Sequence, residues 1–175
     1  LVKIIRDLDK SGWEIGVHGS FGSHENVDYL SKEKNILGEI VGHEIQGILQ
    51  HYLNLSIPLT WQKQKEAGFS YDCSFGFNNK VGFKQNVFYP FNPLNSDFLV
   101  IPVSLMDTVL FHYYNSDQFW NICKNLVDDC VSNNSILNII WHQESFSELD
   151  FPKYTEFYRK LIEYCISKGS KFATS

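Results

Sequence analysis

Three short apolar segments of this chain each end on a histidine. The segments are residues 13–18, 48–51 and 136–142, which end on His18, His51 and His142. Apolar runs of this length that stop at small or polar residues are typical of buried strands. Segments with helical periodicity separate them along the chain. This alternation predicts a mostly parallel α/β sheet or barrel with helices outside.

The remaining segments continue the alternation from end to end. Further strands are predicted at residues 69–74, 98–102 and 171–174. Helices are predicted at residues 1–8, 29–46, 61–67, 117–131 and 153–167. No internal repeat or low-complexity linker interrupts the pattern. A length of 175 residues therefore predicts a single domain with a sizeable core.

The histidines at the strand ends are the first candidate site residues. Parallel strands point the same way, so their carboxyl ends meet where loops converge and where α/β proteins place their chemistry. His18, His51 and His142 are therefore expected to share a site. Neutral imidazoles that converge commonly bind a divalent metal such as zinc, with a carboxylate completing the set. The alternative for each is a strand-end histidine hydrogen-bonded to a backbone carbonyl.

Other polar residues extend the candidate list. Asp72 and Asp107 each lie next to a strand end, and they are the carboxylates considered for completing the metal site or for hydrogen-bonding to its ligands. Asp107 could equally cap a helix. The other three histidines, His24, His43 and His112, fall in loop or helix contexts and are interpreted as surface residues.

The composition excludes several classes of protein. The net charge of −5 comes without any Lys/Arg-rich segment, so nucleic acid is not an expected partner. No apolar run approaches the roughly 20 residues that span a membrane. The four cysteines show no CxxC pair, and their interpretation as buried free thiols fits a reducing compartment. We expect a cytoplasmic protein with no membrane span, whose oligomeric state the sequence does not predict.

Several short motifs follow one another along the chain. They are Trp13–Ser20, Gly47–Leu53, Tyr71–Phe77, Gly82–Lys84 with Tyr89–Phe91, and Trp141–His142. In this order and spacing they resemble the polysaccharide deacetylase family of NodB homology, and most closely its branch found with bacterial surface-polysaccharide genes. The resemblance implies a distorted (β/α) barrel. It also implies an enzyme that depends on a divalent metal ion, with zinc the first choice. The implied reaction is hydrolysis that removes acetyl groups from N-acetylated sugars, so the implied substrate is a carbohydrate.

The resemblance also implies roles for single residues. His18 matches the first histidine of the family's metal motif, and His142 matches its proton donor. Tyr52 matches the tyrosine whose backbone amide helps to form the oxyanion hole. Aromatic rings that could stack on sugar rings are expected at Trp61, Tyr89 and Phe91, although loop packing explains them equally well.

The chain departs from the family pattern in three places. Gly22 replaces the second histidine of the metal motif, and we infer that His51 supplies the missing nitrogen. Leu49 replaces an arginine that would orient the catalytic carboxylate. The family's aspartate motif, which provides the base and a metal ligand, lies on a strand before the first helix. We therefore expect residues 1–175 to be an N-terminally shortened deacetylase domain without its first strand, which could lack activity.

Two alternatives remain open. Gly22 and Leu49 favour a degenerate deacetylase fold that binds a glycan or a metal without turnover, whereas the three strand-end histidines favour an enzyme. The other alternative is hydrolysis of a different carbon–nitrogen bond, such as a cyclic amide, on the same scaffold.

Overall fold

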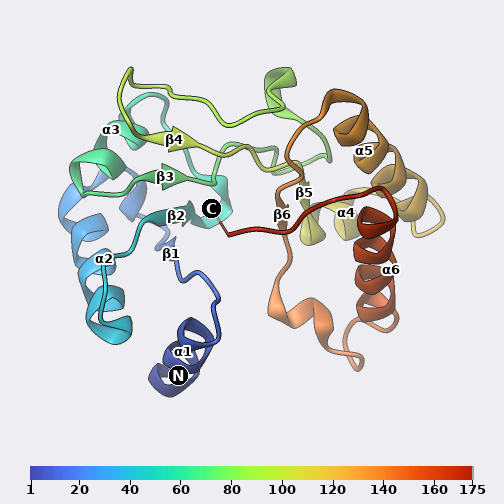
Figure 1. Cartoon of the computed structure of the whole chain (residues 1–175), viewed down its shortest axis with the longest axis horizontal. Coiled ribbons are helices and arrows are strands. Elements are labelled where there is room, and N and C mark those ends of the chain that lie inside the picture. Colours follow the sequence, from blue (N-terminus) through green and yellow to red (C-terminus); the bar gives the residue numbers. More distant parts are fainter. Residues whose placement is uncertain (175) are drawn as a thin grey trace. The chain divides into compact units, whose positions relative to one another are not determined.

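The computed structural model describes residues 1–174, which form two compact units. The first unit contains residues 1–75, 90–101 and 173–174, and the second contains residues 76–89 and 102–172. Figure 1 labels their helices and strands.

A four-stranded parallel sheet organises the first unit. Its strands are β1 (Val17–Gly19), β2 (Gly47–Gln50), β3 (Tyr71–Asp72) and β4 (Leu99–Val100), paired in that order (Figure 1). Its helices are α1 (Val2–Lys10), α2 (Val27–Val41) and α3 (Leu59–Glu66), with 3-10 turns η1 (Ser23–Glu25) and η2 (His51–Leu53). Since α2 and α3 carry the crossovers, β1, β2 and β3 point the same way. The residues that end these strands therefore lie at one edge of this sheet.

A two-stranded parallel sheet and three helices form the second unit. The strands are β5 (Leu105–Met106) and β6 (Ile139–Ile140). The helices are α4 (Asp107–Tyr113), α5 (Phe119–Asn133) and α6 (Tyr154–Ser167), with 3-10 turns η3 (Lys84–Asn86) and η4 (Gln143–Phe146). The core is made by Leu105, Leu110, Phe119, Cys123, Leu126, Val127, Leu161 and Cys165. Burial raises the pKa of the Cys123 thiol to about 12, which keeps this core thiol protonated.

The parallel α/β class is confirmed, and several local predictions are corrected. The described strands pair as one four-stranded and one two-stranded parallel sheet. The predicted strand at 171–174 is wrong, because these residues are exposed and pair with no strand of residues 1–174. Strand β5 and helix α4 were not predicted; they follow Pro102, where a strand was expected to end. Within residues 1–174, no helix has the length and apolar character that crossing a membrane requires.

Local signals explain the bounds of α2, which is shorter than predicted. The Asn26 side chain caps its first turn by accepting from the N–H groups of Asp28 and Tyr29, at 3.0 and 3.1 Å. At the other end Gly42 adopts a left-handed conformation with φ 88°, and its N–H donates to the carbonyl of Gly38. The helix therefore ends at Val41 and leaves residues 43–46 to lead into β2.

Tyr71 in β3 lies across the backbone of Gly47, its register partner in β2. A Cβ atom at position 47 would lie 2.1 to 2.4 Å from atoms of the Tyr71 side chain, so only glycine leaves room for the ring. The Tyr71 hydroxyl then donates to the carboxylate of Glu14, which precedes β1. One ring thus connects the beginnings of three neighbouring strands.

The carboxylate of Asp72, at the end of β3, is fully buried and accepts four hydrogen bonds. Two come from α3, from Gln64 Nε2 at 2.9 Å and from the Trp61 indole N–H at 3.3 Å. Two come from Ser74, from its N–H at 2.9 Å and its hydroxyl at 2.5 Å. Ser74 Oγ in turn accepts from the N–H of Gln50 at the end of β2 (2.8 Å). Burial raises the pKa of Asp72, and the four donors oppose that rise.

We predict that Asp72→Asn destabilises the chain. Asparagine keeps the size of the side chain but turns an NH₂ group toward buried donors, which should cost on the order of 1–3 kcal/mol. Urea unfolding followed by circular dichroism measures this loss. Asp97→Asn is the matched control, because the Asp97 side chain is almost fully exposed. Equal unfolding midpoints for the two variants would contradict the prediction.

A charged cluster on the second unit joins α5 to the end of α6. The carboxylate of Asp128 contacts Lys124 Nζ at 2.6 Å, Lys168 Nζ at 2.8 Å and the Tyr164 hydroxyl at 2.8 Å. The hydrogen bond from Lys124, followed by those from Lys168 and Tyr164, holds the pKa of Asp128 well below its usual range. The ionised carboxylate is therefore the form that binds α6 to α5.

We predict a pH-dependent contribution from this cluster. A carboxylate whose pKa is lower in the folded than in the unfolded state stabilises the fold above its unfolded pKa of about 3.9, and this contribution is lost on acidification. Asp128→Asn should lower the melting temperature at pH 7, and the difference from the wild type should shrink as the pH falls below about 4. Asp129→Asn, at an exposed neighbouring position, is the control. A difference that stays constant with pH would refute the prediction.

Candidate functional site

His18 and His51 contact each other at the edge of the first sheet. His18 lies in β1 with its side chain toward solvent, and His51 follows β2 directly. His18 Nε2 and His51 Nδ1 are 2.8 Å apart, and the two rings meet edge to face. One nitrogen must donate and the other accept, so a single proton lies between them. The structure thus brings together two of the three strand-end histidines.

The backbone turns sharply directly after His51. Tyr52 and Leu53 have φ values of 56° and 53°, in the left-handed region that residues with a Cβ atom seldom adopt. The Tyr52 ring is 67% exposed and lies 4.4 Å from the His51 ring, centroid to centroid. Unusual backbone of this kind concentrates at functional sites. No sequence signal announces it, because the turn contains neither glycine nor asparagine.

The pair offers two nitrogen ligands to a metal, which is less than a complete set. Catalytic zinc sites in proteins use three protein ligands. No group of three or more histidine, cysteine, aspartate or glutamate side chains within residues 1–174 is arranged to bind an ion. His24 was interpreted as a surface residue, but it is half-buried in η1, and its Nδ1 is buried without a hydrogen-bond partner among the described residues. His43 and His112 are exposed, as expected.

The second unit contains a different arrangement around Asp107, which is fully buried at the start of α4. Its Oδ1 accepts from His142 Nδ1 at 2.6 Å and from the N–H of Thr108 at 2.7 Å. Its Oδ2 accepts from the N–H of His142 at 2.7 Å and from the Ser145 hydroxyl at 2.6 Å. Asp107 thus lies beside a candidate catalytic residue instead of only capping its helix.

Parallel pairing explains why Asp107 and His142 meet. Met106 in β5 is the register partner of Ile140 in β6, and the two side chains follow these strands in the same direction. Because the carboxylate accepts from His142 Nδ1, that nitrogen carries the proton. The remaining nitrogen, Nε2, belongs to a ring that is one third exposed and is free to exchange a proton with a substrate.

The aromatic residues expected to bind sugar occupy different environments. Trp61 is only 4% exposed, and its indole donates to Asp72, so it belongs to the core of the first unit and offers no face for a ligand. Phe91 packs edge to face against Trp61 and Phe75. Tyr89, in the second unit, is half exposed, and its hydroxyl donates to the carbonyl of Asn133. Loop and core packing therefore accounts for Trp61 and Phe91, whereas Tyr89 keeps an exposed ring.

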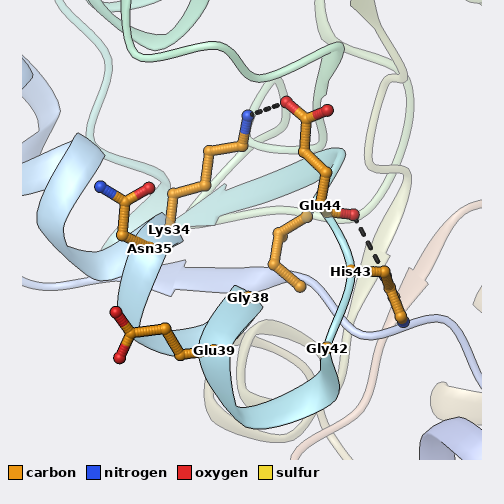
Figure 2. Close-up of a pocket in the computed structure, with 8 residues that line it drawn as sticks. Lys34, Asn35, Gly38, Glu39, Gly42, His43 and Glu44 are labelled. Atoms are coloured by element: carbon orange, nitrogen blue, oxygen red, sulfur yellow. Dashed lines mark hydrogen bonds and ion pairs between the residues drawn. The ribbon is translucent and has the colours of Figure 1, made fainter.

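An open hollow beside α2 contains none of these residues. Figure 2 shows Lys34 extending from α2 toward Glu44, with Nζ 2.7 Å from Glu44 Oε1. Lys34 Nζ also donates to the carbonyl of Gly68, and the ammonium group lowers the pKa of Glu44. The His43 ring donates to Asp9 in α1 (2.8 Å). These contacts join α1 and α2 to residues 43–44, which lead into β2, so we assign this hollow a structural role.

Comparison with known proteins supports the fold. No protein-family model and no curated protein matches the chain. A crystal structure of Puue allantoinase shares 24% identity with a TM-score of 0.65, covering 95% of this chain and 57% of that one. A crystal structure of a probable polysaccharide deacetylase from Pseudomonas aeruginosa PAO1 shares 20% identity with a TM-score of 0.58, covering 93% of this chain and 62% of that one.

These likenesses confirm the fold class expected from the sequence. The chain has an α/β fold of the NodB type, as the resemblance to polysaccharide deacetylases implied. It spans less than two thirds of the length of either structure. The single domain, the surface-polysaccharide branch and the roles of individual residues stay predictions.

Proposed function

We propose that this chain is a hydrolase of carbon–nitrogen bonds that removes acetyl groups from N-acetylated sugars of a polysaccharide or its precursor. The observation that carries the proposal is the buried Asp107 carboxylate, which holds His142 with its Nε2 edge available for proton transfer. The likeness in fold to a probable polysaccharide deacetylase supports the choice of reaction. Asp107 and His142 follow the carboxyl ends of β5 and β6, and α/β folds place their catalytic residues at such strand ends.

The proposed reaction needs a proton at the leaving amine. Water adds to the acetamide carbonyl carbon and loses one proton to the solvent, the carbon–nitrogen bond then breaks, and the products are acetate and a free amine. His142, protonated on both nitrogens, would donate the Nε2 proton to the departing nitrogen while Asp107 keeps the Nδ1 proton in place. The backbone N–H of Tyr52 would donate to the oxyanion that forms when water adds.

Metal dependence is a separate part of the proposal. His18 and His51 would supply two nitrogen ligands to a divalent ion, with zinc the first choice for imidazole ligands. When bound, such an ion would acidify water and polarise a carbonyl. Residues 1–174 provide no set of three ligands, and the proposed proton transfer by His142 does not depend on a metal.

A second candidate reaction is the hydrolysis of a cyclic amide. The likeness to an allantoinase favours it, since ring opening of such a substrate also breaks an amide carbon–nitrogen bond and also requires a proton for the leaving nitrogen. The non-catalytic alternative is a glycan- or metal-binding module, which the residues Gly22 and Leu49 favour. We place the protein in the cytoplasm with a bacterial surface polysaccharide or its precursor as partner, and the four free cysteines support that compartment.

We predict that the 175-residue chain binds zinc through the histidine pair. Isothermal titration with zinc chloride should give one site, and His18→Ala and His51→Ala should each weaken binding at least about 10-fold, because each removes one of the two nitrogens. His112→Ala, at an exposed position in α4, is the control and should bind like the wild type. Unchanged affinity in both variants would remove the metal from the proposal.

The activity assay distinguishes the three candidate functions. Acetate release from N-acetylglucosamine oligosaccharides is measured beside ring opening of allantoin, each with added zinc. We expect acetate release, and His142→Ala should lower kcat by about 10²–10⁴-fold, because a general acid acts only as the amine departs. His112→Ala again serves as the control. Turnover of allantoin alone would establish the second candidate, and oligosaccharide binding without turnover of either substrate would establish the binding module.

A further inference from the structure

We propose that Ser145 is a positioning residue for His142, acting through Asp107. The proposal rests on the proposed function, in which His142 transfers a proton. Ser145 lies in η4, three residues after His142, and is 3% exposed. Its hydroxyl donates to Asp107 Oδ2 at 2.6 Å, a distance typical of a strong bond between a hydroxyl and a carboxylate.

Residues 142–145 surround the Asp107 carboxylate with three donors from one turn. The N–H of Ser145 donates to the His142 carbonyl at 3.1 Å, which closes the turn. The His142 N–H, the His142 ring and the Ser145 hydroxyl then all point to the same carboxylate. The turn therefore fixes the position of its own histidine by binding an acceptor at the start of α4.

The distribution of donors shows what the Ser145 hydroxyl adds. Oδ1 accepts from the His142 ring and from Thr108, while Oδ2 accepts from the His142 N–H and from Ser145. Without the hydroxyl, Oδ2 would keep one donor, and the carboxylate could rotate about its Cβ–Cγ bond. Rotation would move Oδ1 out of line with Nδ1, so the ring would lose its fixed orientation and its fixed tautomer.

The geometry excludes a nucleophilic role for Ser145. A serine nucleophile is activated by a hydrogen bond to the base nitrogen of a histidine. The Ser145 hydroxyl bonds instead to the carboxylate, on the Nδ1 side of the His142 ring, and it is buried. Ser145 is therefore placed to act on the acid through Asp107 and not on the substrate.

The test compares Ser145→Ala with Ser145→Thr and with a matched control. Ser104→Ala removes another buried hydroxyl of the second unit, which donates to the Asn138 carbonyl at 3.2 Å and does not contact Asp107. The first readout is the ¹⁵N spectrum of the histidine rings, which reports whether His142 carries its proton on Nδ1. The second is kcat and KM for acetate release.

We expect Ser145→Ala to mix the two His142 tautomers and to lower kcat about 10-fold with KM unchanged, because one bond to a charged group is lost. Ser145→Thr, which keeps the hydroxyl, should restore both, and Ser104→Ala should change neither. If Ser145→Ala does not fold, Ser145→Cys keeps the volume with a weaker donor and should fall between serine and alanine.

The two readouts separate the two proposals. A wild-type tautomer and wild-type kcat in Ser145→Ala, or in Ser145→Cys if alanine does not fold, would overturn the positioning role. A changed tautomer in a chain that hydrolyses no substrate would support the positioning role and reject the hydrolase. The tautomer measurement requires no turnover, so the positioning role is decided in either case.

Discussion

A carboxylate buried away from water has to be met by hydrogen-bond donors, and each unit of this protein is built around one such group. Leaving a buried charged group unpaired costs several kcal/mol, so the donors must be in place whenever the fold forms. Asp72 recruits its donors from α3 and from the turn after β3, within about a dozen residues. Asp107 takes one donor from the adjacent Thr108 and the other three from His142 and Ser145, which lie 35 and 38 residues further along the chain.

The two carboxylates use the same device to different ends. Every donor to Asp72 is a neutral, buried group. The hydrogen bonds therefore join α3, β2 and β3 and leave no part of the network at the surface. Asp107 holds an imidazole whose far edge reaches the surface. A buried acceptor of this kind fixes the orientation of an imidazole without covering its opposite edge. The same hydrogen-bonding chemistry thus joins secondary-structure elements in one unit and orients a partly exposed imidazole in the other.

The sequence predicts the fold better than it predicts the site. Alternating apolar and helical segments were sufficient for the parallel pairing of the strands and for the helices, because burial periodicity is a local property. The contact between His18 and His51 also follows from parallel strand ends. The burial of Trp61 and Asp72 could not be predicted in this way, since the sequence around a tryptophan near a loop does not indicate whether its ring packs into the core or faces solvent. The left-handed turn at Tyr52 and Leu53 carries no signal either, because residues with ordinary side chains occupy it.

The close approach of Tyr71 to Gly47 has a consequence for how this sequence can change over evolutionary time. An aromatic ring at position 71 and a side chain at position 47 exclude each other, since any Cβ atom at 47 would overlap the ring. Which residues are tolerated at position 47 therefore depends on the residue at position 71. Replacing Tyr71 by a small residue would make room for a side chain at position 47, but it would also remove the hydroxyl that donates to Glu14. Gly22, where a Cβ atom would meet nothing within 4 Å, carries no such coupling. Gly47 is thus strongly constrained and Gly22 is not, and only the folded structure shows the reason, which is the space around each Cα atom.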